Sequence, residues 1–483
     1  MSQARPLWSR ADVLAATGGE ALGETLGEDW QATGVSIDSR SLAAGDLFVA
    51  LPGPRYDGHD FVAQALTAGA AAALCQRRPD NLPPQSRLVI VPDSLAGLAA
   101  LGRFARTRSE ATCIAVTGSV GKTSTKEMLR HVLAAQAPAF ASAASHNNHW
   151  GVPLTLARLP HEARYAVFEI GMNHPGEIRP LTRLVRPLVA LVTTIAPAHV
   201  EYFPEGLAGI ADAKAEIFEG LPPGGHAVIN ADAPMADRLI ERAQAQRARI
   251  VTFGRSERAT LRLVDCSLHA TSSAVKARLG RETLDYCLSL PGEHMVMNSL
   301  GVLAAVRAAG ADPVRAATAM AGLKSLKGRG LRQRLELPPG THAGGAFDLI
   351  DDSYNANPTS MRAAFAVLAG ANLGPGGRRI AVLGDMLELG TEAASLHHGL
   401  AQPLIAGNID LVFCCGPAMR ALYDALPTGR RGLWAPDSQS LAGLVAERLR
   451  PGDVVLVKGS LGSRMARVIE RLASGASPSA ASA

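Results

Sequence analysis

The sequence has few aromatic residues and no long hydrophobic run. Phe, Trp and Tyr make up 4% of its 483 residues, and the longest Ala-rich stretch, residues 62–75, is interrupted by Gln64. A membrane-spanning helix needs roughly 20 apolar residues in succession, so we predict no integral membrane association. The first residues also lack the apolar segment and small-residue cleavage site of an export signal, which favours a cytoplasmic location.

Cysteine is scarce as well. The six cysteines, at positions 75, 113, 266, 287, 414 and 415, form no C-x-x-C pair, which argues against a zinc ribbon and against a disulfide framework. The net charge is +5, but the basic residues are scattered and do not alternate with aromatic side chains as in proteins that bind single-stranded nucleic acid. We therefore expect no nucleic-acid partner and favour small anionic ligands.

The order of apolar runs predicts an α/β protein of three domains. In residues 1–110, short strands are expected at 46–51 and 87–91, with an alanine-rich helix at 61–73. In residues 111–328 and again in 329–473, short apolar runs alternate with helical stretches, which is typical of a parallel sheet covered on both faces. Residues 324–330 resemble a hinge, and residues 474–483 form a polar tail that has nothing to bury.

The strongest local signal is a phosphate-binding loop. An apolar run at 113–117 is followed by a glycine-rich segment and then by apolar residues at helical spacing. Backbone N–H groups of such a loop wrap a polyphosphate, while Lys122 reaches the terminal phosphates and the Thr123 hydroxyl ligates Mg²⁺. The loop is a shortened G-x-x-G-K-[ST] form, because Val116 stands where the longer motif has Gly. The nucleotide-binding residues are predicted to be Gly118, Ser119, Val120, Gly121, Lys122, Thr123 and Ser124. The alternative is a glycine turn that opens a helix beside a solvated lysine.

Three further residues are candidates for the same chemistry. Glu169 ends an apolar strand at 165–169, where a parallel sheet presents ligands, and we assign it a role linked to Mg²⁺. A structural role as the cap of the next turn is the alternative. His199 follows the run at 190–194, but an isolated histidine there is more often structural. Lys214 is one of only seven lysines among 48 basic residues, although spacing alone gives it no role.

Several separated motifs, taken together, resemble one family. They are DSR at 38–40, GDLFVALPGPRYDGHDF at 45–61, TGSVGKTSTKEML at 117–129, NNHWGVPLTL at 147–156, FEIGMNHPGEI at 168–178, AHVEYF at 198–203, AKAEIF at 213–218, GEHMVMNSL at 292–300, DDSYNANPTSMRAA at 351–364, VLGDMLELG at 382–390 and VKGS at 457–460. In this order, and over nearly the whole chain, they resemble the ATP-dependent Mur ligases of peptidoglycan synthesis.

The resemblance implies a small N-terminal α/β domain that binds a uridine nucleotide, a central ATPase domain with a phosphate loop, and a Rossmann-like C-terminal domain that closes over the site. The segment at 352–358, DSYNANP, resembles the branch that adds D-alanyl-D-alanine to UDP-N-acetylmuramoyl-tripeptide through an acyl phosphate, using ATP and Mg²⁺. A monomer is expected. The other candidates are a folylpolyglutamate synthase-like ligase on the same scaffold and a nucleotide-gated binding module.

The resemblance also implies roles for individual residues. Glu169 and His199 would be Mg²⁺ ligands beside Thr123, and Lys214 matches a lysine that is carbamylated in these ligases and then holds a second Mg²⁺. The remaining roles are UDP-sugar contacts by Ser39, Arg40, Asp57, Gly58 and His59; substrate contacts by Asn148, Asn355 and Asn357; adenine and ribose contacts by Asn298 and Asp351; and phosphate contact by Arg329, with Arg332 and Arg334 as alternatives in the hinge.

Overall fold

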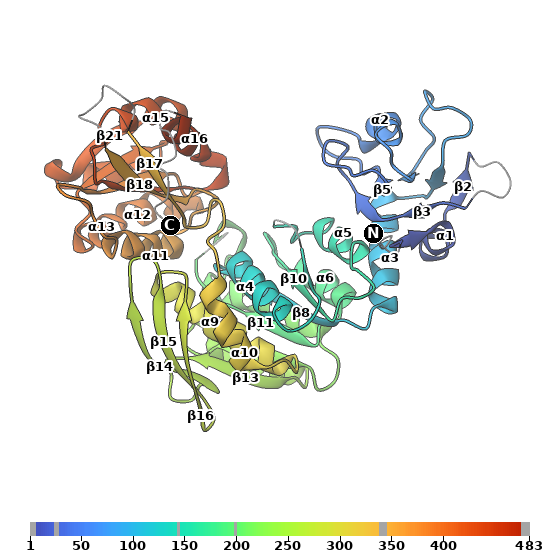
Figure 1. Ribbon diagram of the computed structural model, residues 1–483, viewed down its shortest axis with the longest axis horizontal. Helices are drawn as coiled ribbons and strands as arrows, with labels where there is room; N and C mark the ends of the chain where they lie inside the picture. The colour runs from blue at the N-terminus through green and yellow to red at the C-terminus, as the bar shows by residue number, and fades with distance from the viewer. Residues whose placement is uncertain (1–5, 24–28, 143–144, 198–199, 338–344, 475–483) are drawn as a thin grey trace.

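The computed structural model describes residues 6–23, 29–142, 145–197, 200–337 and 345–474. The chain forms three lobes in sequence order, and each is built around its own mostly parallel sheet (Figure 1). The three-domain α/β architecture predicted from the sequence is therefore confirmed. The limits 1–110, 111–328 and 329–473 stay predictions, and most of the expected polar tail, residues 475–483, lies outside the described residues.

The N-terminal lobe contains a five-stranded sheet of order β2-β7-β6-β5-β4. Strand β2 is antiparallel to β7, and the other pairs are parallel. The bounds are β2 Glu20–Leu22, β4 Gly34–Ser36, β5 Asp46–Val49, β6 Ala72–Cys75 and β7 Leu88–Ile90; a short pair, β1 Trp8–Ser9 and β3 Gln31–Ala32, lies beside α1 Arg10–Thr17. Helix α3, Ser94–Arg108, leads from this lobe to the central one.

The helix expected at 61–73 is shorter in the structure. Helix α2 spans Val62–Thr67, and Ala72–Cys75 is the buried strand β6 between β5 and β7. Gly69 lies between them with a φ of +98°, a backbone conformation that does not continue a helix. Alanine has a high helix propensity, but burial on both faces of a sheet outweighs it here.

The central lobe is a nine-stranded sheet of order β16-β15-β14-β13-β12-β11-β8-β10-β9. The strands from β9 to β14 run parallel, whereas β14, β15 and β16 form an antiparallel extension that the sequence reading did not anticipate. The bounds are β8 Thr112–Thr117, β9 Ala139–Ala141, β10 Tyr165–Glu169, β11 Val189–Val192, β12 His226–Asn230, β13 Arg249–Gly254, β14 Leu261–Leu268, β15 Ser273–Leu279 and β16 Glu282–Leu288.

Helices cover both faces of the central sheet. One apolar core includes residues of α4 Lys122–Ala134, α9 Glu293–Ala308 and α10 Pro313–Ala319. The other includes residues of α5 Gly151–Ala157, α6 Ile178–Val185, α7 Leu207–Ala215 and α8 Ala236–Ala245. Because both faces are buried, the parallel strands β8, β10 and β11 read as continuous apolar runs, which is why the sequence located them.

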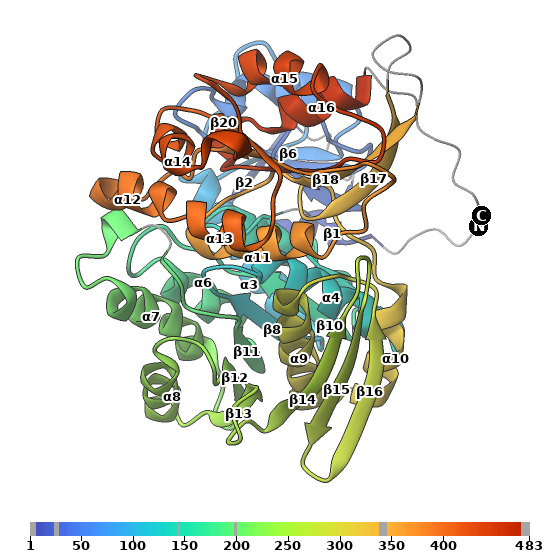
Figure 2. The same cartoon turned by 90° about the vertical axis from the view of Figure 1, so that its left-hand side faces the viewer.

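The C-terminal lobe has a six-stranded sheet of order β17-β18-β22-β19-β20-β21, in which only the β17–β18 pair is antiparallel. The strands are β17 Leu331–Glu336, β18 Ala346–Asp352, β19 Arg379–Gly384, β20 Leu411–Cys415, β21 Arg431–Ala435 and β22 Val454–Lys458; the helices are α11 Pro358–Ala369, α12 Ala393–His398, α13 Ala401–Ala406, α14 Met419–Ala425, α15 Ser438–Ala446 and α16 Ala466–Ser474. Helix α11 lies on the side of this lobe that faces the central one (Figure 2). No helix among the described residues is long and apolar enough to cross a membrane.

Candidate active site

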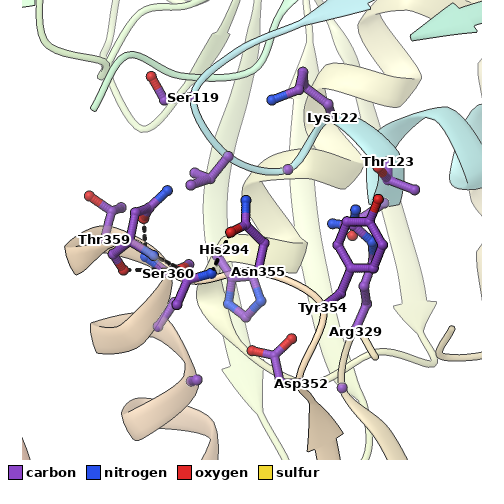
Figure 3. Close-up of a pocket in the computed structure, with 18 of the residues that line it drawn as sticks. Ser119, Lys122, Thr123, His294, Arg329, Asp352, Tyr354, Asn355, Thr359 and Ser360 are labelled. Carbon is purple, nitrogen blue, oxygen red and sulfur yellow. Dashed lines mark hydrogen bonds between the residues drawn. The ribbon is translucent and has the colours of Figure 1, made fainter. Parts of the chain in front are cut away.

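A cavity of about 610 Å³ lies between the central and C-terminal lobes. On the side of the central lobe, its wall is the glycine-rich loop after β8 together with the start of α9, and the segment after β18 lies opposite (Figure 3). The segment after β22 also contributes to this opposite wall. Parallel strands present their carboxyl ends to ligands, so this position agrees with the general rule for open α/β sheets. Every predicted loop residue from Ser119 to Ser124 lines the cavity.

The loop owes its shape to two glycines. Gly118 has a φ of +147°, and a side chain there would meet the Thr193 hydroxyl, whereas Gly121 has a φ of +84° and lies against the Asn298 side chain. Helix α4 then begins at Lys122, so its first N–H groups and the positive end of its dipole face the cavity. The Lys122 ammonium donates to the Gly118 carbonyl at 2.8 Å. The arrangement fits a polyphosphate.

Glu169 ends β10 with its side chain 1% exposed. One carboxylate oxygen accepts from the Thr123 hydroxyl at 2.7 Å, and the other accepts from the Asn147 amide at 2.8 Å. A buried carboxylate beside a hydroxyl supplies the oxygen ligands that Mg²⁺ prefers, so the two residues fit this metal. Within the described residues no three His, Cys, Asp or Glu side chains cluster as a metal site, and the predicted ligand His199 lies outside those residues.

Lys214 lies on α7 and is 2% exposed. Burial, together with repulsion from the nearby Lys122, lowers its pKa well below the usual value for lysine. The pKa of Lys122 is also lowered, first by burial and then by Arg329, while Glu169 opposes the shift. Burial and the neighbouring positive charge therefore both disfavour the charged form of Lys214.

The hinge brings Arg329 to the cavity. Its guanidinium stacks at 4.2 Å on the ring of Tyr354 and donates to the Ser145 hydroxyl at 3.4 Å, so it spans the two lobes (Figure 3). Of the three hinge arginines considered from the sequence, only Arg329 lines this cavity in the described residues. Asp351 is buried and accepts hydrogen bonds from the Gly328 and Ser353 backbone N–H groups. Its neighbour Asp352, which the sequence reading missed, lines the cavity instead.

A lysine from the C-terminal lobe completes the wall of the cavity that lies opposite the phosphate-binding loop. Lys458 ends β22 and donates to the Asp352 carboxylate at 2.7 Å and to the Asn355 carbonyl at 2.9 Å. Asn355 and Asn357 both line the cavity, but Asn357 also caps α11 by accepting from the Ser360 N–H at 2.9 Å. Sequence reasoning assigned no role to Lys458, although the rarity of lysine among the basic residues was a usable signal.

Of two asparagines predicted to contact a ligand near the loop, one lines the cavity and the other does not. Asn298 lines the cavity close to Gly121, as a nucleotide contact requires. Asn148 does not line it and accepts from the Gly151 N–H at 3.0 Å, at the start of α5. The preceding residue, Asn147, is in the cavity and holds Glu169. His294, on α9, also lines the cavity and was not predicted; burial, the largest cause, lowers its pKa.

The five residues predicted to bind the UDP-sugar lie in the N-terminal lobe, outside this cavity. Arg40 is exposed and pairs with Asp38 at 2.7 Å. His59 is buried, with one ring nitrogen 2.5 Å from the Asp57 carboxylate and the other accepting from the Gln76 N–H at 2.9 Å. Burial opposes ionisation of Asp57, but hydrogen bonds from His59 and Arg77 prevail and lower its pKa to about 2. The His59 side chain thus supports this loop. The remaining two predicted contacts are Ser39 and Gly58.

Three family models match successive parts of the chain. They are described as the Mur ligase family catalytic domain at residues 31–108, the Mur ligase middle domain at 116–306 and the Mur ligase glutamate ligase domain at 333–461. Each falls within a different lobe of the structure.

Similar full-length proteins were found as well. The chain is 37% identical to the UDP-N-acetylmuramoyl-tripeptide–D-alanyl-D-alanine ligase of Escherichia coli, over 93% of this chain and 96% of that protein. A crystal structure of MurF from Acinetobacter baumannii matches with a TM-score of 0.83 at 29% identity, over 97% and 99% of the two chains. The MurF ligase of Thermotoga maritima in complex with ADP matches with a TM-score of 0.72 at 27% identity, over 91% and 96%. On this evidence the chain belongs to the Mur ligase family.

Proposed function

We propose that the chain is an ATP-dependent ligase that joins D-alanyl-D-alanine to UDP-N-acetylmuramoyl-tripeptide, as the name of its Escherichia coli relative describes. The observation that supports this proposal most strongly is the cavity between the central and C-terminal lobes. There the phosphate-binding loop faces an arginine of the hinge and a lysine of the C-terminal lobe. The Thermotoga maritima relative, whose structure is a complex with ADP, supports the binding of an adenine nucleotide. We propose that the protein acts in the cytoplasm and that it is a monomer.

The reaction requires that a poor electrophile be activated. A carboxylate resists attack by an amine because its leaving group would be oxide. Transfer of the γ-phosphoryl group of ATP to the terminal carboxylate of the tripeptide gives an acyl phosphate and ADP. Attack by the dipeptide amine then forms the amide and expels inorganic phosphate, with loss of a proton from nitrogen. No nucleophilic serine or cysteine is needed, and we assign none.

Charge neutralisation is the main task of the residues around the loop. Two anions meet in the first step, and the transferred group carries negative charge throughout. Lys122, the loop N–H groups and the N-terminus of α4 act on this charge from the central lobe. Arg329 acts from the hinge, held by Tyr354. Asn298, which lines the cavity, is proposed for the adenine and ribose side of the nucleotide. Asp351 is proposed to support that side from behind the cavity wall, through the Gly328 and Ser353 N–H groups that it holds.

Thr123 and Glu169 are the described residues that would hold Mg²⁺, with His199 as a third ligand. When bound, the metal neutralises phosphate oxygens and orients the transferred group. We propose that Lys214 is carbamylated, because an uncharged buried amine is the form that adds CO₂. The carbamate would be an anion beside Lys122, which removes the repulsion between two ammonium groups.

The two substrates are proposed to enter from the outer lobes. Ser39, Arg40 and the segment Asp57, Gly58 and His59 are assigned to the UDP-sugar in the N-terminal lobe, and the tripeptide would then reach toward the loop past Asn148. Asn355 and Asn357 are assigned to the peptide at the C-terminal wall, where they offer hydrogen bonds without added charge. Closure of the two lobes around the cavity protects an acyl phosphate from water.

A test of acceptor dependence separates this function from its competitors. Phosphate release should require both UDP-tripeptide and D-alanyl-D-alanine, and mass spectrometry should find the nucleotide-linked pentapeptide. Tripeptides with meso-diaminopimelate and with L-lysine are compared in parallel, and L-alanyl-L-alanine is the matched control for the acceptor. Release that is indifferent to both substrates would indicate a nucleotide switch, and release driven by a folate with glutamate would indicate the other ligase. Either result rejects the proposal.

A further inference from the structure

A second cavity lies in the central lobe, away from the loop. Its volume is about 530 Å³. Its walls come from the start of β12, the middle of β13, the β13–β14 connection, the β15–β16 turn and the last two turns of α9. Helix α9 packs against β13 and β14, and the cavity lies where this helix ends at Ala308. We call it the basic cavity, after Arg262, Arg278 and Arg307 in its lining.

Strand register forces two of these arginines together. In the antiparallel β14–β15 pair, Arg262 stands directly opposite Arg278, so the two side chains leave the same face of the sheet. Like charges in this position destabilise a sheet. Arg307 adds a third positive charge from α9. The single carboxylate in the lining belongs to Glu257, which is 86% exposed and 3.4 Å from Arg262. The positive charge is therefore poorly compensated.

Two nitrogen atoms that are buried beside this cavity lack hydrogen-bond partners. Within the described residues, Nε of Arg262 and Nδ1 of His226 are both buried without a hydrogen bond. An unsatisfied buried polar atom costs on the order of a full desolvation penalty, so structures rarely leave two in one place. Neither Arg278 nor Arg307 has an ion-pair or hydrogen-bond partner for its side chain among the described residues. Among the described residues of the lining, the three guanidinium groups thus have only the exposed carboxylate of Glu257 to pair with.

The rest of the lining is apolar. Ala304 and Ala308 of α9, Val251 of β13 and Leu279 of β15 contribute to it. Ala304 and Leu279 are almost fully buried, whereas Val251 and Ala308 remain partly exposed. A ligand that carries an apolar portion would cover the latter two and gain the free energy of burial.

We propose that the basic cavity binds a small organic anion, in which a phosphate or carboxylate group is held by the three arginines and an apolar portion lies against α9. The site is separate from the nucleotide site. Asn298 and Arg307 are nine residues apart on α9, which corresponds to about 13 Å along the helix axis. The proposal does not depend on the reaction assigned to the first cavity.

Phenyl phosphate is a suitable probe, because it combines a dianion with an apolar ring. The full-length protein is first saturated with Mg²⁺ and a non-hydrolysable ATP analogue, so that the phosphate-binding loop is filled. Calorimetric titration gives the Kd of the probe, and methyl-labelled NMR spectra report on Val251 and Leu279. We expect the methyl signals of these two residues to shift, and inorganic phosphate to bind more weakly than phenyl phosphate. Benzyl alcohol, which has the ring without the charge, should not bind.

The variant Arg278→Gln/Arg307→Gln tests the charges without disturbing the fold, because both side chains are exposed. The matched control is Arg103→Gln/Arg471→Gln, which removes the same charge from exposed positions in the other two lobes. We expect at least a tenfold increase in Kd for the first variant and less than a twofold change for the control. Equal Kd values for wild type and the first variant, or probe binding that leaves Val251 and Leu279 unshifted, would overturn the proposal. Thermal unfolding curves of both variants confirm that they are folded.

Discussion

The two cavities at opposite ends of α9 satisfy their charged groups in different ways. In the cavity between the lobes, Glu169 has hydrogen-bond donors for both oxygens, Lys458 is paired with Asp352, and Arg329 is stacked on Tyr354. In the basic cavity, like charges face each other and buried nitrogen atoms have no partner among the described residues. The first cavity holds its groups in place before a ligand arrives, whereas the second leaves the positive charge of its arginines for a ligand to balance.

The largest expected effect concerns the loop. Lys122→Ala should lower turnover by at least about 10²–10³-fold, since removal of one preorganised donor to a developing negative charge has that effect in other enzymes. Turnover is measured as pentapeptide formed, and circular dichroism checks that the fold is intact. The control is Arg278→Gln, which removes one positive charge from the basic cavity and should leave turnover unchanged. Near-normal activity of Lys122→Ala would reject the assignment of ATP to the loop.

Lys214 offers a second test of the first cavity. Lys214→Ala should lose most of its turnover if a carbamate is the working group, and added formate or acetate should restore part of it by supplying a carboxylate in the space left by the side chain. Lys126→Ala, which removes another buried lysine of the central lobe, is the control. It should not respond to either acid. Full activity of Lys214→Ala without added acid would exclude the carbamate.

The sequence predicted the first cavity well because its residues come in contiguous motifs. The loop from Gly118 to Ser124 is one segment, and the end of β10 at Glu169 could be located from a continuous apolar run. Two of the residues that it missed are direct neighbours of residues that it predicted, and the structure decides which of the two neighbours faces the cavity. Asp352 lines it rather than the predicted Asp351, because side-chain direction alternates along strand β18. Asn147 lines it rather than the predicted Asn148, whose side chain instead accepts from the Gly151 N–H at the start of α5.

The second cavity was not visible in the sequence at all. Arg262 and Arg278 are 16 residues apart, and only the register of β14 and β15 places them opposite each other. That antiparallel extension was missed, although β15 alternates buried and exposed residues in a strand-like way from Ser273 to Leu279. Arg307 is then added from a helix. Such a site depends on contacts between segments that are far apart in the sequence, and no local sequence pattern reveals these contacts.

The stacking of Arg329 on Tyr354 predicts a moderate effect. Tyr354→Leu removes the ring and should raise the KM for ATP or lower kcat by about 2- to 30-fold in total, because a cation–π contact contributes about 0.5–2 kcal/mol. Tyr354→Phe keeps the ring and should stay close to wild type. Steady-state kinetics at varied ATP separates the two parameters. An equal loss in Tyr354→Phe would show that the hydroxyl matters, and that the ring does not position Arg329.

The smallest expected effect concerns the repulsion between the two facing arginines of the basic cavity. Arg278→Thr removes one of two facing like charges from β15, and it should raise the melting temperature of the central lobe in dilute Tris-chloride. A cross-strand charge pair contributes about 0.2–1 kcal/mol, which corresponds to a rise of at most about 2–4 °C for a domain of this size. Lys276→Thr is the control on the same strand. Its lysine stands opposite Asp265 and Asp285, so its removal should lower the melting temperature or leave it unchanged.

Salt and ligand should act on Arg278→Thr in separable ways. High chloride should shrink the gain in melting temperature, because exposed charges are screened beyond about 3 Å at 1 M salt. Phenyl phosphate should reverse the order of the two proteins, because it stabilises wild type through the arginine that the variant lacks. A gain that persists at 1 M chloride would assign the effect to the better packing of threonine in a strand, and the facing arginines would then carry no strain for a ligand to relieve.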